Sequence, residues 1–259
     1  MKKLYFITAL AFIGSYSLLA QPTVVQNHAF QPKEKISYNV YYSVIGIYVN
    51  AGTATFTTSN EKMQDEDVFH VVCEGSTNPR YDWIFKVRDR YESYFSTTDL
   101  KPIRFVRNIN EGTYKKNEET NFNHQTNTAT TRNVVYQVPE NVQDVISVMY
   151  YMRNINYDQN KAGDKIPFTM FLKDKVYSMY IHYIGKEIIR TGHGKFNAIK
   201  LKPLLLKEGV FEGAEKMTIW VTDDANHIPV RVESPIVVGS VKIDLMHCEN
   251  PKNPITALL

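Results

Sequence analysis

Two groups of residues in this sequence could do chemistry, and the first is acidic. Asp223-Asp224-Ala225-Asn226 is the densest acidic point between two strongly predicted strands, and its oxygens could hold a cation or act as an acid/base pair. Adjacent carboxylates on an extended chain point to opposite sides, and Asp and Asn in turns bond to their own backbone. Asp223, Asp224 and Asn226 therefore indicate a turn or a cation site, and the turn is the simpler interpretation.

The second group is aromatic and belongs to a strand with apolar or aromatic residues on both faces. It consists of Tyr177, Tyr180, His182 and Tyr183, in a chain with 17 Tyr and 13 Phe. A phenol ring packs in apolar surroundings while its hydroxyl finds a polar partner, so these four residues could line a site for an apolar ligand. A strand buried between two layers explains the same pattern without any ligand.

Other signs of catalysis are absent from the sequence. It contains no phosphate-cradling G-x-x-x-x-G-K-[ST] loop, no G-x-S-x-G elbow, no H-E-x-x-H and no C-x-x-C. The seven histidines are scattered, and none is paired at the i, i+4 spacing of a helix or the i, i+2 spacing of a strand. We therefore expect no metal and no cofactor, and no residue is assigned as catalytic. An Asp/His hydrolytic site assembled from distant strands is the alternative.

The formal net charge of +3 argues against nucleic acid as a partner. Two of the positive charges, Lys2 and Lys3, belong to a predicted signal peptide that is removed, so the mature chain is nearly neutral. Nucleic-acid-binding proteins, by contrast, usually carry a strongly basic surface. Cys73 and Cys248 are the two cysteines, so one intramolecular pairing is conceivable. The alternation of side chains along their two strands does not require the cysteines to face the same core. Whether they form a disulfide stays open.

The elements that must position these groups are mostly strands. Side chains alternate between apolar and polar from Ile36 to Val44, and similar segments recur about every ten residues, with turns expected at 50–52, Lys173-Asp174 and Gly185. This pattern predicts a mainly β protein: a curved antiparallel sheet that forms an open barrel or a two-sheet sandwich.

One segment, residues 144–154, follows a helical period instead. Val145, Val148, Met149 and Met152 are spaced for one helical face, and Asp144 can cap the first turn. We expect this single amphipathic helix to pack against the sheet.

The N-terminus reads as a secretory signal peptide over residues 1–20. Lys2 and Lys3 precede an apolar run that is shorter than a membrane span and ends at Ala20. The predicted organisation is then an extended leader (21–33), one β-rich domain (34–250) and a short tail (251–259). We expect an exported protein, periplasmic or associated with the cell envelope, without a transmembrane segment after signal cleavage.

Several stretches together resemble a known family over about residues 34–248. They are Asn50–Ala54, Phe85–Asp89, Asp144–Ser147 with Tyr150–Arg153, Trp220–Pro235 and Val238–Lys242. The chain is similar in these stretches to the exported bacterial domain-of-unknown-function family 3108. The resemblance implies a β-rich envelope protein without an established activity, and it brings no catalytic residues.

These observations favour an exported binding or scaffolding module that is not an enzyme. Its expected partner is a lipid-like or other apolar small molecule, or another envelope protein. Two alternatives stay open: the Asp/His hydrolase, and a protein–protein interaction module that pairs through exposed edge strands.

Overall fold

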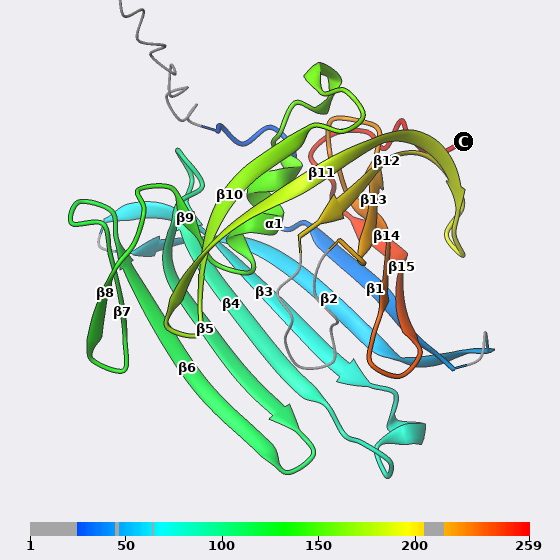
Figure 1. Cartoon of the computed structure of the whole chain (residues 1–259), viewed down its shortest axis with the longest axis horizontal. Coiled ribbons are helices and arrows are strands. Elements are labelled where there is room, and N and C mark those ends of the chain that lie inside the picture. Colours follow the sequence, from blue (N-terminus) through cyan, green and yellow to red (C-terminus); the bar gives the residue numbers. More distant parts are fainter. Residues whose placement is uncertain (1–24, 45–46, 64, 205–214) are drawn as a thin grey trace, which may run out of the picture.

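The computed structural model describes residues 25–44, 47–63, 65–204 and 215–259, and its body is one continuous sheet of 15 strands (Figure 1). The expected signal peptide therefore lies outside the described residues. The strands of the first half are β1 (Lys35–Val44), β2 (Ile47–Met63), β3 (Glu66–Thr77), β4 (Arg88–Ser96), β5 (Pro102–Glu111), β6 (Tyr114–Asn123), β7 (Thr128–Thr131) and β8 (Val134–Gln137). Those of the second half are β9 (Val142–Gln143), β10 (Lys165–Leu172), β11 (Lys175–Arg190), β12 (Lys195–Pro203), β13 (Thr218–Thr222), β14 (Pro229–Pro235) and β15 (Ser240–Glu249).

The sheet is a meander whose first and last strands pair with each other. Its order is β8-β7-β6-β5-β4-β3-β2-β1-β15-β14-β13-β12-β11-β10-β9, and every pair is antiparallel except β9–β10. Both edge strands, β8 and β9, belong to one short stretch of chain. Gln137 and Val142 are five residues apart, so at most about 18 Å separates the two edges there. The sheet must curve round to meet these connections, which confirms the predicted mainly β fold with a curved, barrel-like sheet.

Two of the predicted turns are instead irregularities inside long strands. Gly52 lies within β2, where the pairing with β1 shifts register, and a Cβ on it would collide with the carbonyl oxygen of Ser76. Gly185 lies within β11 at another register shift and has φ of +142°, a conformation that favours glycine. Glycine followed by resumed alternation thus marked bulges rather than chain reversals. The turn at Lys173-Asp174 is confirmed, with φ of 49° and 65° as a tight hairpin requires.

Among the described residues, the one α-helix, α1 (Ser147–Arg153), is shorter than the predicted 144–154, and two 3-10 helices span Pro79–Tyr81 and Tyr157–Gln159. The carboxylate of Asp144 accepts hydrogen bonds from the backbone N–H groups of Ile146 (2.7 Å) and Ser147 (2.8 Å), so residues 144–146 cap the helix rather than extend it. The predicted apolar face is partly wrong, because Met149 is exposed while Tyr150 is buried.

The aperiodic leader contributes to the core. Ala29 and Phe30 are fully buried, and the Phe30 ring meets those of Phe69 and Tyr150 with centroids 4.9 and 4.7 Å apart. Residues 25–33 therefore form part of the packed structure although they follow neither a strand nor a helix period.

The two cysteines stand in one row across the sheet. Cys248 is paired with Ile36, Ile36 with Phe56, and Phe56 with Cys73. Three strand spacings place them about 14 Å apart, too far for a disulfide. Both are free thiols, and burial raises the pKa of each to about 12, which suits packing rather than reactivity.

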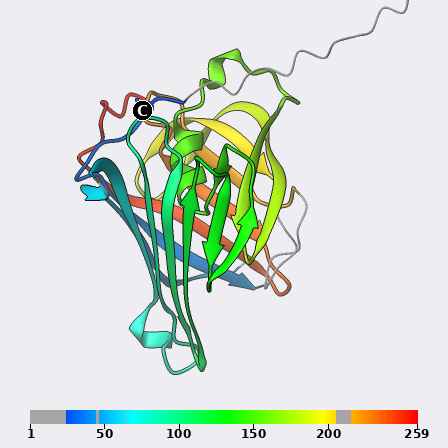
Figure 2. The same ribbon diagram turned by 90° about the vertical axis from the view of Figure 1, so that its left-hand side faces the viewer.

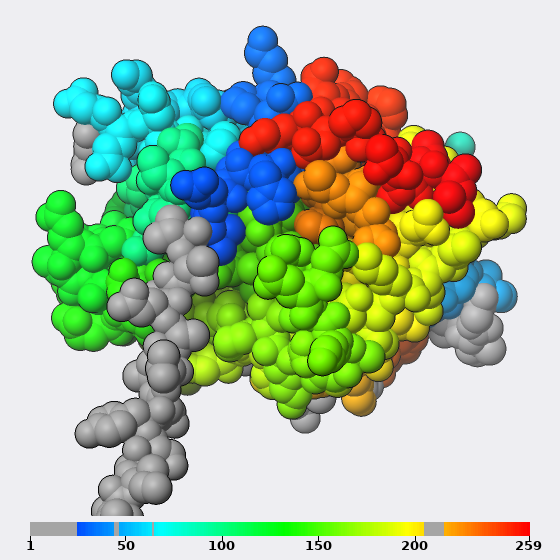
Figure 3. All heavy atoms as spheres, turned by 90° about the horizontal axis from the view of Figure 1, so that it is seen from above, coloured from blue at the N-terminus to red at the C-terminus, as the bar shows by residue number. Residues whose placement is uncertain are grey.

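The connections between strands divide into two ends of the sheet. The leader and the tail lie side by side at one of them, the termini end (Figure 3), where the side-chain amide of Asn253 donates to the carbonyl of His28 (2.9 Å). The β1–β2, β3–β4, β5–β6 and β14–β15 connections lie at the opposite end, the tip end. There, the hairpins of β3–β6 reach beyond the remaining strands (Figure 2).

Candidate functional site

The four predicted ligand residues on β11 do not form one group. Tyr183 is buried in a core cluster with Ile181, whereas Tyr180 and His182 alternate onto the other face of the strand. There, the carboxylate of Glu215 accepts from the Tyr180 hydroxyl (2.7 Å) and lies 3.0 Å from Nδ1 of His182. Tyr177 lies on the same face of β11 as Tyr183 and is half-buried. A ligand role for these residues stays a prediction.

The acidic group forms the connection between β13 and β14, where its side chains tie the turn to the rest of the chain. Asp224 accepts from the Thr222 hydroxyl (2.8 Å) and from the Asn226 backbone N–H (3.0 Å). The buried Asn226 side chain donates to the carbonyl of Asn253 and accepts from its N–H, at 3.0 and 2.9 Å. Asp223 forms an ion pair with Lys186 (2.8 Å). These contacts hold the turn and the tail together.

The histidine beside this turn does not complete an acid/base pair. Nδ1 of His227 donates to the carbonyl of Arg153 (2.7 Å), and burial lowers the pKa of the imidazole. Among the described residues, no three His, Cys, Asp or Glu side chains gather closely enough to hold a metal ion. The arrangement therefore gives no geometric support for hydrolysis at this place.

A buried ion pair at the termini end joins three distant parts of the chain. The Arg153 guanidinium, at the end of α1, donates to both carboxylate oxygens of Glu34 at 2.6 and 2.9 Å. It also donates to the carbonyl of Asn226 (2.9 Å) in the turn and to that of Ala29 (3.1 Å) in the leader. Because its guanidinium is buried and makes four hydrogen bonds to protein groups, Arg153 is a structural residue rather than a binding one.

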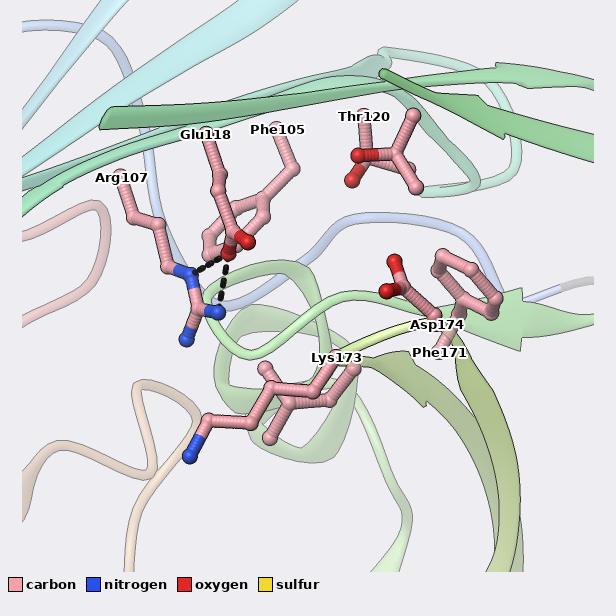
Figure 4. Close-up of a pocket in the computed structure, with 9 residues that line it drawn as sticks. Phe105, Arg107, Glu118, Thr120, Phe171, Lys173 and Asp174 are labelled. Carbon is pink, nitrogen blue, oxygen red and sulfur yellow. Dashed lines mark hydrogen bonds and ion pairs between the residues drawn. The ribbon is translucent and has the colours of Figure 1, made fainter. Parts of the chain in front are cut away.

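Two pockets among the described residues are both small. One pocket lies between β5–β7 and the β10–β11 turn, where Arg107 bonds to Glu118 opposite Lys173 and Asp174 (Figure 4). Its volume is about 10 Å³, enough for about one water molecule. A second pocket, lined by Tyr48 and by the β14–β15 hairpin, has about 200 Å³. Both fall short of the roughly 300 Å³ at which small-molecule pockets begin.

Large apolar side chains are exposed on the connections of the tip end and on the strand residues next to them. We call the following nine residues the apolar tips: Ile47, Tyr48, Val49, Trp83, Ile84, Phe85, Tyr114, Val237 and Val238. Trp83, Ile84 and Phe85 are 82%, 63% and 53% exposed, and they are consecutive. Soluble proteins expose single apolar residues routinely, but a group at one end of a molecule is typical of an interaction surface.

The connection that carries Trp83 is held in place by hydrogen bonds. The Asp82 carboxylate accepts from the Thr77 hydroxyl (2.7 Å) and from the Arg88 guanidinium (2.6 Å), which lowers the pKa of Asp82. The backbone N–H of Gly112 in the neighbouring β5–β6 turn donates to the carbonyl of Lys86 (2.7 Å). The exposed side chains thus project from an ordered base.

Sequence patterns did not reveal the apolar tips. An exposed apolar residue at the end of a strand has the same identity as a buried one in its middle. The available signal was the run Trp83-Ile84-Phe85, which follows the turn-forming Asn78-Pro79 and is neither alternating nor helical.

Comparison with solved structures places the fold among barrel-like β proteins. A β-barrel-like protein of domain-of-unknown-function family DUF1849 from Brucella abortus is 10% identical, with a TM-score of 0.57 over 86% of this chain and 99% of that one. A candidate exported protein with a YmcC-like fold from Bacteroides fragilis is 13% identical, with a TM-score of 0.37 over 85% and 97%. At such identities the likeness to the Brucella protein concerns the fold alone.

Within the described residues, no helix has both the length and the apolar character to cross a membrane.

Two further comparisons bear on identity. The search of curated proteins finds no match. The sequence profile of one family matches residues 37–246, which is most of the chain and includes the stretches singled out in the sequence. The chain therefore belongs to the protein family of unknown function DUF3108.

Proposed function

We propose that this protein is an exported binding or scaffolding module of the cell envelope, without catalytic activity, that engages an apolar partner through its apolar tips. The observation that carries the proposal is the concentration of large exposed apolar side chains on four neighbouring connections at one end of the sheet. Complete burial of a fully exposed apolar side chain contributes roughly 1.5–3 kcal/mol, and each of these partly covered side chains, 38–82% exposed, would contribute a corresponding share.

The rest of the molecule supports a surface role over an internal one. The buried aromatic residues, such as Phe30, Phe95 and Tyr150, pack against each other. The polar groups around Asp224 and Arg153 are bonded within the protein. An apolar small molecule held among Tyr177, Tyr180, His182 and Tyr183 is the less supported version, because these residues divide between the two faces of β11.

Placement in the envelope rests on the sequence. The basic Lys2-Lys3 followed by an apolar run to Ala20 is the pattern of an export signal. We propose that the mature chain, starting near Gln21, acts outside the cytoplasm.

Site-specific photocrosslinking in intact cells tests the proposed function. A photoreactive residue would replace Trp83 or Val237 in the apolar tips, and Val134 on the edge strand β8 as the matched exposed apolar control. We expect adducts with lipid or protein from positions 83 and 237 and not from 134. Adducts from 134 alone would support the edge-strand alternative, and their absence from 83 and 237 would contradict the proposal.

A further inference from the structure

We infer that the partner of four of the apolar tips is an anionic lipid surface. These four, the Trp83 cluster, are Trp83, Ile84 and Phe85 on the β3–β4 connection and Tyr114 at the start of β6, beside the adjacent β5–β6 connection. The inference rests on the proposed function and names the chemistry of its partner.

The residue types of the cluster are those found where a protein enters the boundary between lipid headgroups and acyl chains. Trp and Tyr concentrate where headgroups meet acyl chains, because their rings are apolar and carry one polar group. Ile84 and Phe85 stand next to Trp83 and are apolar throughout, as insertion beneath the headgroups requires. The cluster also protrudes, since the β3–β6 hairpins extend beyond the other strands (Figure 2).

Three cations surround this apolar cluster. Arg80, Lys86 and Lys115 are exposed, and none forms an ion pair with a described residue. Of the nearby acids, Asp82 is neutralised by its 2.6 Å ion pair with Arg88. Asp89 and Glu111 lie on the same hairpins, so the three cations outnumber the remaining carboxylates by one. Each unpaired cation close to an anionic membrane contributes about 1 kcal/mol of attraction at moderate ionic strength.

The termini end has no such excess of cations. Four of the seven acidic residues on its connections, Asp99, Glu140, Asp158 and Asp223, form ion pairs with Lys101 or Lys186. The other three, Asp65, Asp164 and Asp224, are balanced by Lys33, Lys161 and Lys252. An anionic surface therefore attracts the Trp83 cluster more than the opposite end, which favours an orientation with the tips toward the lipid.

The size and shape of the cluster favour lipid over a folded partner or a second copy of the chain. A stable protein interface buries about 800 Å² on each partner. Three aromatic side chains and one isoleucine, each with at most about 150–250 Å² and already partly covered, provide less. Acyl chains adapt to a protruding tip without needing a complementary groove. The hydrogen bonds to Asp82 order the connection beforehand, which reduces the entropy lost on insertion.

Vesicle flotation of the mature full-length chain tests the inference. The probes are vesicles of phosphatidylethanolamine with phosphatidylglycerol, and vesicles of phosphatidylcholine alone. We expect flotation with the anionic vesicles, weaker flotation with the neutral ones, and release at high salt. The double variant Trp83→Ser/Ile84→Ser should lose at least about tenfold in affinity. The matched control Val134→Ser/Val135→Ser on β8 should bind as the unaltered chain does.

Fluorescence gives a second readout, because the chain has two tryptophans. In a Trp220→Phe variant, Trp83 is the single reporter, and its emission should shift to the blue with anionic vesicles. The triple variant Arg80→Gln/Lys86→Gln/Lys115→Gln should bind more weakly and with less salt dependence. Circular dichroism confirms that each variant is folded.

The outcomes separate this inference from the proposed function. If folded protein does not float, or floats regardless of Trp83→Ser/Ile84→Ser, the lipid surface is wrong. Protein adducts at position 83 in cells, without flotation, would retain the proposed function and overturn the inference. Concentration-dependent dimerisation that Trp83→Ser abolishes would identify a second copy as the occupant and likewise overturn it.

Discussion

The termini end and the tip end differ in what surrounds their side chains: buried polar partners at the first and solvent at the second. At the termini end, Arg153 is 4% exposed and its guanidinium bonds to Glu34, Asn226 and Ala29, so leader, helix and turn share one buried network. At the tip end, Trp83 is 82% exposed, and the hydrogen bonds lie beneath it, around Asp82. One end therefore supplies stability, and the other holds apolar surface available for contact.

This difference should separate two kinds of variant. Substitutions at the termini end should lower the free energy of unfolding and affect binding only through unfolding. Substitutions at the tip end should change the free energy of unfolding by less than about 1 kcal/mol and remove binding.

The largest effect is expected from Arg153→Met. It leaves the fully buried Glu34 carboxylate without its partner, which costs about 3–5 kcal/mol of unfolding free energy. Chemical denaturation followed by circular dichroism measures it. The double variant Arg153→Met/Glu34→Met should recover part of the loss, because no uncompensated charge remains buried.

The matched control for this ion pair is Arg132→Ala. Arg132 pairs with Asp174 near the protein surface, where an ion pair contributes at most about 1 kcal/mol. Equal losses from Arg153→Met and Arg132→Ala would show that the buried network does not stabilise the fold as described.

The next largest effect compares one residue type at the two ends. Phe30→Ala opens a cavity against Phe69 and Tyr150 and should cost about 3 kcal/mol or more, although the leader can partly collapse. Phe85→Ala, at the half-exposed tip position, should cost less than about 1 kcal/mol. Similar denaturation midpoints for the two variants would contradict the assignment of the leader to the core.

A pH-dependent effect is expected from Asp144, the helix cap at the termini end. Burial raises its pKa from 3.8 to about 6, against the opposing influence of hydrogen bonds from Ser93 and Ser147. Between these values the folded state binds a proton that the unfolded state has released. The contribution of Asp144 to the free energy of unfolding therefore falls by about 3 kcal/mol as pH rises from about 4 to 6.

The variant Asp144→Asn isolates this contribution. It keeps an oxygen acceptor for the N–H groups of Ile146 and Ser147 and removes the titration. Denaturation curves of both proteins at several pH values give their difference in stability. That difference should change across this window, and a constant difference would show that Asp144 keeps an ordinary pKa.

The smallest effect on stability is expected from Trp83→Ser. Because the indole is mostly exposed, its loss should change the free energy of unfolding by no more than about 0.5 kcal/mol. In a chain that carries the photoreactive residue at position 237, the same variant should give fewer adducts in cells. A marked loss of stability would show that the Trp83 cluster belongs to the packed structure, and the contrast between the two ends would fail.

Alternation in the sequence predicted most strands and the curved sheet, because a sheet with one buried face imposes a period of two. It failed at Gly52 and Gly185, where a bulge and a turn both call for glycine and the sequence cannot separate them. It also missed Phe30, because the leader packs through isolated contacts without a repeating backbone geometry.

The candidate site was harder to predict than the fold. The side chains at 177, 180, 182 and 183 have similar chemistry, which suggested one binding group. They lie on opposite faces of one strand, however, so the fold separates them. The pairing of Glu34 with Arg153 joins residues 119 positions apart, which no local pattern encodes. The apolar tips depend on where each hairpin ends relative to the body of the sheet, and that is a property of the whole fold.

The pairing of β1 with β15 has a consequence for the order in which the molecule can assemble. Lys35 lies opposite Glu249, so a chain that emerges from the ribosome N-terminus first leaves one side of β1 without a partner until β15 has been made, more than 200 residues later. An unpaired edge of this kind invites aggregation, and contacts so distant in sequence form slowly. The nascent protein should therefore depend on holding chaperones until β15 arrives.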